Sequence, residues 1–430
     1  MERIKPLQSV KKFYFLDYFY ILLLSIEKHS KRNDIFSYFK DLKQKNRLGQ
    51  SKYKRLTDDG ENLTQKQLQL YKYTFRQVVE ESKEYGLIKE ISEENLTLST
   101  LGREFLQIYN NKGFASFVHS MAKLMEDNYR AFRTLLEYLY QTNTRRSGVL
   151  IFPHYSPLEL NFIRKKIQTS LDVRNYCREL VKRLESDIEL HLKKTIKLEE
   201  KNNEIVNKLV SDGLLPVRDN EAFRPQDYNK ITKRIRDFWI NHFLKELYKC
   251  QYTMSTFDLW VYRAKQVGVI NVTESYPFTN GKLLYPTAVV MEQTATNDFK
   301  EIYKYSDGKK LFVHDPESQT FQNVFVDELV KRYFNIRKIK QNYFINIAAL
   351  REAVCYSLKI SPQTFERLIN EVYRLNLQGQ LRIRISLEVD RLPEETNAMY
   401  LKQEPVMVDG NYRNIIAIDV TKGDKNEQFN

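Results

Sequence analysis

The segment from Tyr85 to Tyr109 constrains the fold of this chain more than any other. It reads YGLIKEISEENLTLSTLGREFLQIY and passes from the end of a helical pattern through a glycine, a short apolar strand, a polar turn, a second strand and a further apolar helix. Gly86 stands where a helix would end, since glycine readily adopts the left-handed backbone of a C-cap. The segment therefore predicts a β-hairpin held between two helices.

Three helices are predicted before this hairpin, and they span residues 15–28, 34–45 and 65–84. Thr64 and Gln67 form a T-x-x-Q capping box, which gives the third helix a defined start. A basic loop, residues 43–60 (KQKNRLGQSKYKRLTDDG), separates the second helix from the third. The apolar run 13–26 contains Asp17 and is shorter than the roughly 20 residues needed to cross a bilayer. It is predicted to be a buried core helix, and no membrane association is expected.

Two weaker versions of this order follow. The second has two helices, a glycine and two strands, predicted at 228–248, 255–266, Gly268, 269–273 and 282–285. Asn280 and Gly281 suit the type I′ turn of its hairpin. The third has a helix at 347–358, Ser361 as N-cap with Pro362 at the first helical position, a helix to Asn376, and the strand LRIRISLEV at 381–389.

The order of helix, helix, turn, helix and two-stranded hairpin resembles the winged helix-turn-helix fold. YGLIKE through LTLSTLGREFL is similar to that family's usual ending, in which the wing returns through Leu-Thr into a helix that begins with glycine. The resemblance covers about half of the chain, in up to three modules. It implies a mainly α fold with small β-hairpins (α+β), in which multiple winged helix-turn-helix modules are joined by a helical scaffold.

The scaffold is predicted between residues 114 and 210, which have helical patterns throughout. One apolar stripe runs along a long helix through Val173, Cys177, Leu180, Leu184, Ile188, Leu192 and Ile196. This helix either connects modules, binds a partner or packs within its own domain. The domains are predicted as a winged-helix module at 1–112, a helical scaffold at 113–225, a second winged-helix module at 226–290, a connector at 291–335, a C-terminal winged-helix module at 336–395 and a tail at 396–430.

Charge and side-chain faces point to nucleic acid. The net charge of +14 and the pI of about 9.3 favour a polyanionic partner. On the predicted helices 65–84 and 362–376, one face is apolar and the other carries side chains that can contact DNA. We predict as DNA-binding residues on these faces Lys66, Gln69, Tyr73, Arg76, Gln363, Arg367, Asn370 and Arg374. Arg, Asn and Gln can form bidentate hydrogen bonds to base edges in the major groove.

The wings differ between the first and third modules. In LRIRI, Arg382 and Arg384 alternate with apolar residues, so both guanidiniums are predicted on one exposed side, where they can clamp phosphates. The first wing carries Glu90, Glu93 and Glu94, which repel phosphate. If the first module contacts DNA, its helix and the basic-loop residues Lys52, Lys54 and Arg55 must do so. The alternative is that this module binds protein.

Enzymatic motifs are lacking. The sequence contains no G-x-S-x-G, P-loop, G-x-G-x-x-G or H-E-x-x-H, and its six histidines have no metal-ligand spacing. The three cysteines fit neither a disulfide framework nor a zinc site, and they are expected to be reduced, as in a cytoplasmic protein. We therefore expect no catalytic residue, no cofactor and no metal.

The sequence thus predicts a non-enzymatic, cytoplasmic protein that binds double-stranded DNA. It would act as a regulator or as the DNA-recognition subunit of a prokaryotic antiviral defence or replication complex, with an ATPase or nuclease as protein partner. The alternative is a kleisin-like protein-protein scaffold of a chromosome-organising or defence ATPase. Whether the chain forms a homo-oligomer is left open.

Overall fold

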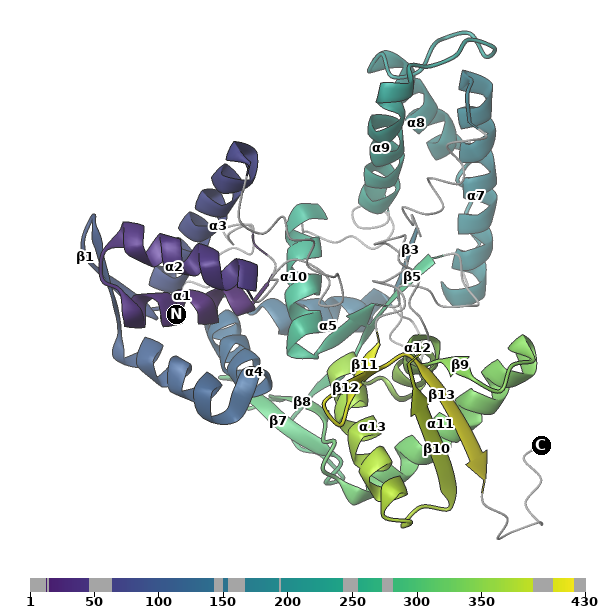
Figure 1. Ribbon diagram of the computed structural model, residues 1–430. Coiled ribbons are helices and arrows are strands. Elements are labelled where there is room, and N and C mark those ends of the chain that lie inside the picture. The colour runs from purple at the N-terminus through teal and green to yellow at the C-terminus, as the bar shows by residue number, and fades with distance from the viewer. Residues whose placement is uncertain are drawn as a thin grey trace. The chain divides into compact units, whose positions relative to one another are not determined.

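The computed structural model describes residues 13, 15–45, 64–142, 150–153, 167–192, 195–242, 254–272, 281–389 and 405–420. These residues are mainly helical and form small antiparallel sheets of two or three strands (Figure 1). The chain divides into two compact units. The first comprises 1–136, 255–270 and 287–318, and the second comprises 137–254, 271–286 and 319–430.

The first unit begins with three helices and a hairpin, in the order that the sequence predicts. The helices are α1 (Asp17–Lys28), α2 (Arg32–Lys45) and α3 (Gln65–Glu84), and the hairpin consists of β1 (Ile88–Ser92) and β2 (Asn95–Leu98). The apolar run 13–26 lies largely in α1, where Phe19, Leu22 and Leu23 are fully buried. This confirms the prediction of a core helix.

Local hydrogen bonds fix the start of α3. The backbone N–H of Gln67 donates to the Thr64 hydroxyl at 3.3 Å, and the Thr64 N–H donates to the Gln67 side-chain oxygen at 2.9 Å. These reciprocal bonds are the predicted capping box. A short bridge between Lys31 and Asn95 adds a third segment to the hairpin, so that β2 lies between β1 and residue 31.

Two glycines explain how closely the helices approach the hairpin. Gly86 has φ +72°, the left-handed conformation expected at the end of α3. Gly102 lies in the first turn of α4 (Thr100–Tyr129), and a Cβ atom on it would be 2.1 Å from the carbonyl oxygen of Leu87. Ser99 caps α4 and its hydroxyl donates to the same Leu87 oxygen at 2.9 Å. Only glycine at position 102 lets α4 pack against the hairpin backbone.

Later segments of the chain complete the first unit. They are most of α10 (Met254–Val267) and the strands β6 (Ala288–Met291), β7 (Phe299–Lys304) and β8 (Lys310–His314), which form a sheet in the order β6-β8-β7. The Arg263 guanidinium of α10 donates to both carboxylate oxygens of Glu81 on α3, at 2.6 and 2.9 Å. Both side chains are fully buried, so this ion pair joins α10 to α3 inside the unit.

Glu126 is a second buried carboxyl group of the first unit. It lies near the end of α4, where one of its oxygens accepts from the Tyr305 hydroxyl at 3.0 Å and from the Arg133 backbone N–H at 2.9 Å. Its other oxygen has no hydrogen-bond partner among the described residues. Burial raises the pKa of Glu126 from 4.5 to about 7.

This shift predicts a pH-dependent stability. Between about pH 4.5 and pH 7 the folded chain holds a proton that the unfolded chain releases, so the free energy of unfolding falls as the pH rises. The contribution is fully present below pH 4.5 and lost above pH 7, and it amounts to about 3 kcal/mol. Glu126→Gln cannot ionise and is expected to remove it. Urea unfolding of both proteins from acid to neutral pH would measure the difference, and parallel curves would contradict the prediction.

The second unit contains a group of helices with α7 (Ser170–Leu192), α8 (Glu199–Ser211) and α9 (Tyr228–Asn241). The predicted apolar stripe on α7 is buried at Val173, Cys177, Leu184 and Ile188. The predicted single helix is wrong at its end, because α7 stops at Leu192 and Ile196 lies in the segment before α8. The prediction of helix throughout 114–210 is also wrong, since β3 (Leu150–Pro153) interrupts it.

The predicted second module, 226–290, does not lie in one unit. Helix α9 belongs to the second unit and nearly all of α10 to the first. The expected return strand is present as β5 (Gly281–Pro286), but it pairs with β3 as well as with β4 (Ile270–Val272), in the order β3-β5-β4. Asn280 of the predicted turn lies outside the described residues.

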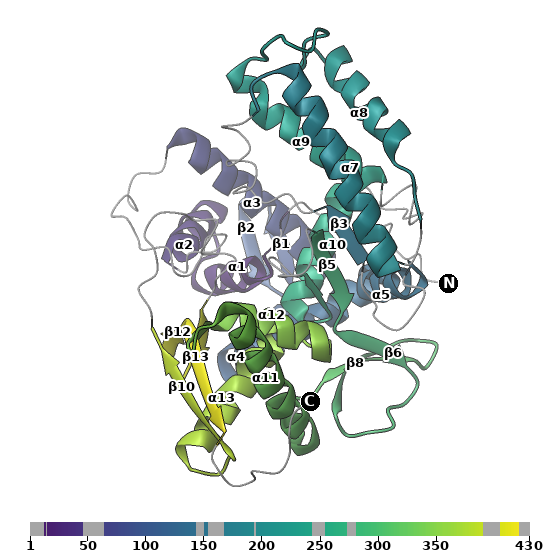
Figure 2. The same ribbon diagram turned by 90° about the vertical axis from the view of Figure 1, so that its right-hand side faces the viewer.

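The C-terminal part of the second unit forms its own core. Its elements in chain order are α11 (Gln319–Lys340), β9 (Ile345–Asn346), α12 (Ile347–Leu358), α13 (Pro362–Leu377), β10 (Ile383–Glu388), β11 (Val406–Val408), β12 (Asn411–Arg413) and β13 (Ile415–Val420). We call residues 319–420 the C-terminal module. The three helices pack on one face of the sheet β10-β13-β9 (Figure 2).

This module extends beyond its predicted bounds of 336–395 at both ends. Helix α11 contributes Phe325 and Leu329 to the core, and β13 contributes Ile416 and Ile418. Residues 415–420, predicted to belong to a tail, form the central strand of the sheet. The predicted bounds of α12, the Ser361 cap and Pro362 at the first position of α13 agree with the structure.

Candidate nucleic-acid interface

Helix α13 has the two faces that the sequence predicts. Phe365, Leu368, Ile369 and Val372 are fully buried, whereas Gln363, Arg367 and Arg374 are exposed. The Asn376 side chain holds the end of this helix to β10, since it accepts from the Ile385 N–H at 2.9 Å and donates to the Ile385 carbonyl at 3.2 Å. The core fixes which side chains of α13 remain outside.

Asn370 does not belong to this exposed set. Its amide donates to the carbonyls of Glu366 and Met407, each at 2.7 Å, and its oxygen accepts from the Asp409 N–H at 3.0 Å. A base edge would have to displace these bonds. The side chain instead holds the β11-β12 hairpin against α13, and we leave Asn370 out of the recognition face.

Arg374 is exposed but paired. Its guanidinium donates to both carboxylate oxygens of Glu371 and, at 3.2 Å, to the side-chain oxygen of Gln378. Exposed ion pairs of this kind contribute little stability, so the guanidinium can exchange its partner. The exposed face of α13 therefore carries Gln363 and Arg367 in its first half and Arg374 further along.

The predicted wing arginines, Arg382 and Arg384, lie at the beginning of β10. Burial alternates along β10, with Ile383, Ile385 and Leu387 buried and Arg384 exposed, as predicted. Arg382 is also exposed and precedes the strand. Both arginines are at the beginning of β10, next to the end of α13, and the chain leaves for residues 389–405 from the opposite end of the strand.

The corresponding face of α3 in the first unit is also exposed. It carries the four predicted residues Lys66, Gln69, Tyr73 and Arg76, while Phe75, Val78 and Val79 on the other face are buried. Leu70 is 60% exposed on the same helix. The basic-loop residues Lys52, Lys54 and Arg55 lie outside the described residues.

Two charges near α3 have roles that the sequence did not indicate. Glu90 of the first hairpin forms ion pairs with Lys83 and, at 3.3 Å, with Arg32, and the hydrogen bond from Lys83 lowers the pKa of Glu90. Its charge is thus compensated. Lys43, predicted to begin the basic loop, lies in α2 with its ammonium 3.9 Å from the centre of the Tyr71 ring. Lys43 is buried and therefore a poor phosphate contact, and the same burial lowers its pKa to about 8.

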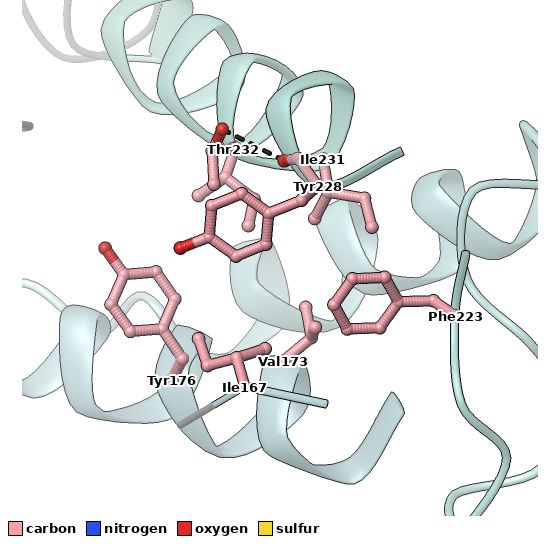
Figure 3. Close-up of a pocket in the computed structure, with 8 residues that line it drawn as sticks. Ile167, Val173, Tyr176, Phe223, Tyr228, Ile231 and Thr232 are labelled. Carbon is pink, nitrogen blue, oxygen red and sulfur yellow. Dashed lines mark hydrogen bonds between the residues drawn. The ribbon is translucent and has the colours of Figure 1, made fainter. Parts of the chain in front are cut away.

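Other kinds of site find little support in the described chain. Figure 3 shows an apolar pocket between α7 and α9, into which Val173, Phe223 and Tyr228 project. Its enclosed space of about 10 Å³ has room for at most one water molecule. The Thr232 hydroxyl beside it donates to the Tyr228 carbonyl at 3.1 Å. No group of three His, Cys, Asp or Glu side chains in the described ranges could hold a metal ion.

Within the same ranges, no helix has the length and hydropathy needed to span a bilayer. Comparison with known proteins adds no relative, since the chain matches no protein-family model, no curated protein and no solved structure.

One basic surface was missed by sequence reasoning. It lies at the end of α11, and the signal was visible in the run RYFNIRKIKQNYF, residues 332–344, where four arginines and lysines stand between and beside two pairs of aromatic residues.

Proposed function

We propose that this chain is a non-enzymatic protein that binds duplex DNA, and that the C-terminal module is a winged helix-turn-helix with α13 as its recognition helix. The order α11-β9-α12-α13-β10-β13 supports this, together with the position of β13 between β10 and β9. The beginning of the first unit has the same order of elements. There Lys31 takes the place of the first strand, and β2 lies between Lys31 and β1.

The exposed face of α13 is the observation that carries the proposal. A helix held by four fully buried apolar residues presents Gln363 and Arg367 outward. Both side chains can form paired hydrogen bonds to base edges in the major groove. A net charge of +14 adds an attraction to phosphate that does not depend on sequence. We infer a regulator or the DNA-recognition subunit of a prokaryotic defence or replication complex.

Arg367→Ala tests this proposal. Losing one bidentate contact is expected to remove about 1–3 kcal/mol of discrimination at one base pair, while much of the phosphate-driven affinity remains. Selection from a randomised duplex library would measure the preferences of the wild type and of the variant. Lys331→Ala is the matched control, because Lys331 is an exposed basic residue of the same module on α11.

The selection has two outcomes that count against the proposal. Identical preferences in the wild type and Arg367→Ala would show that α13 does not read bases. If the wild type, Arg367→Ala and Lys331→Ala all fail to enrich any duplex sequence, α13 is only a solvated helix. That result would favour a protein-docking role.

The second candidate is a scaffold in which the beginning of the first unit docks a protein partner. Two large apolar side chains favour it: Leu70 on α3 is 60% exposed and Ile91 on the first hairpin is 71% exposed. Such a kleisin-like subunit of an ATPase would have no DNA affinity of its own. A salt titration separates the candidates, because phosphate contacts give an affinity that falls steeply with salt.

A further inference from the structure

The last turn of α11 and the segment after it form a basic surface around one tyrosine. The Arg337 guanidinium lies 5.0 Å from the centre of the Tyr343 ring and 6.0 Å from that of Phe334. The two aromatic residues are 37% and 38% exposed, respectively. Lys338 and Lys340 lie in the same turn of α11. We call Arg337, Lys338, Lys340, Tyr343 and Arg384 the α11-end patch.

Tyr343 is held at both ends. Its carbonyl accepts from the hydroxyl of the buried Tyr333 at 2.7 Å, and its own hydroxyl donates to the Asp419 carboxylate of β13. Asp419 is directly opposite Arg384 in the pairing of β13 with β10. The contacts therefore run without interruption from Arg337 through Tyr343 and Asp419 to the strand that carries Arg384.

The cations of this patch form no ion pair within the part of the chain that the structure describes. Among the described residues, no carboxylate lies within ion-pair distance of Arg337, Lys338, Lys340 or Arg384. The Asp419 carboxylate, which borders the patch on β13, accepts a hydrogen bond from the Tyr343 hydroxyl. Other basic residues of this module do pair: Arg332 pairs with Glu328, and Arg374 with Glu371. These four cations, which form no ion pair among the described residues, favour an anionic binding partner for this region.

The geometry of Arg337 suits a phosphate. A guanidinium packed against aromatic rings keeps its orientation while the N–H groups at its edge stay available, and it can bind two phosphate oxygens at once. Arg337 has no hydrogen-bond acceptor among the described residues. Lysines beside it add charge without fixed geometry.

We propose that the α11-end patch binds the sugar-phosphate backbone of nucleic acid, as a second contact of the C-terminal module besides the exposed face of α13. This inference rests on the proposed DNA-binding function. It also gives Arg384 a role in this patch rather than in a wing tip. Nucleic acid is favoured over an acidic protein because the patch offers an oriented guanidinium and unpaired lysines.

The test compares the affinity of variants for a generic duplex of random sequence, measured by fluorescence anisotropy over a range of salt concentrations. Arg337→Ala is expected to weaken binding on the order of tenfold at low salt and to reduce the slope of log affinity against log salt by about one. The weakening should be equal for all sequences, unlike that of Arg367→Ala. Lys331→Ala, on the same helix but outside the patch, is the control.

A pair of tyrosine variants tests the orienting role. Tyr343→Ala removes the ring against which Arg337 packs and should weaken binding as Arg337→Ala does. Tyr343→Phe keeps the ring and should retain more of the affinity. Circular dichroism and thermal unfolding would show that each variant is folded, and Arg337→Ala alone decides if Tyr343→Ala does not fold.

Each remaining outcome has a separate meaning. If the wild type binds the duplex and Arg337→Ala binds it with the same affinity as Lys331→Ala, this inference is overturned. The proposal for α13 is not affected by that result. If the wild type binds polyglutamate more tightly than DNA, the patch is assigned to an acidic protein partner. That result would also overturn the inference that the patch binds nucleic acid. A wild type with no affinity for any duplex would overturn both proposals.

Discussion

Replacing Arg263 by methionine is expected to lower the free energy of unfolding of the first unit by about 3–5 kcal/mol. The substitution leaves the fully buried Glu81 carboxylate without its guanidinium partner. In the described part of the chain, the donor that remains for Glu81 is the Tyr85 hydroxyl at 2.8 Å, which does not neutralise the charge. The variant also loses the bond from Arg263 to the Phe13 carbonyl at 3.1 Å.

A double variant is the control for this prediction. Arg263→Met combined with Glu81→Leu removes both charges, and replacing a whole buried ion pair by apolar residues is often neutral. Urea unfolding should therefore show the single variant as much less stable than the double variant. Equal loss in both would mean that packing, rather than the unpaired charge, determines the effect.

Leu368→Ala is the second large effect, with an expected loss of about 2–5 kcal/mol. Leu368 is fully buried between α13 and the rest of the C-terminal core, so truncation leaves a cavity. Its neighbour Arg367 is exposed, and Arg367→Ala should change stability by less than about 0.5 kcal/mol. Chemical unfolding of the two variants compares adjacent positions on opposite faces. A similar, small loss in both would contradict the packing of α13.

Features with local causes could be predicted from the sequence. The bounds of α3 and α12 agree with the prediction because capping residues and apolar periodicity act within one or two turns. The two faces of α13 follow from the same periodicity. Gly86 was predictable for a similar reason, since its φ of +72° serves the turn that directly follows α3.

Features that depend on distant residues left no such signal. The strand β13 pairs with β10 across the long segment 389–414, so the sequence reading ended the module too early. The pairing of β3 with β5 joins residues 150–153 to 281–284 and was equally hidden. No pattern in the sequence near Glu81 predicts its ion pair with Arg263. Strand pairing and buried ion pairs are fixed by tertiary contacts rather than by local preference.

The sequence predicted which side chains of the candidate site are exposed better than it predicted which hydrogen bonds they form. The periodicity of α13 placed Gln363, Arg367 and Asn370 together, but only the structure reveals that the Asn370 amide bonds to the β11-β12 hairpin. Likewise, alternation along β10 predicted an exposed Arg384, but not that Asp419 lies opposite it. Which exposed cations stay unpaired depends on neighbours that are remote in sequence.

The discontinuity of the first unit has a consequence for folding during synthesis. Glu81 and Arg263 are 182 residues apart in the chain, and translation at about 5–20 residues per second separates their appearance by about 10–40 s. During this interval the emerging α1-to-α4 segment lacks the cation that compensates its buried carboxylate, as well as the sheet of β6, β7 and β8. We therefore expect the first unit to be accessible to chaperones and proteases on the ribosome until residues 255–318 have left the exit tunnel and complete its core.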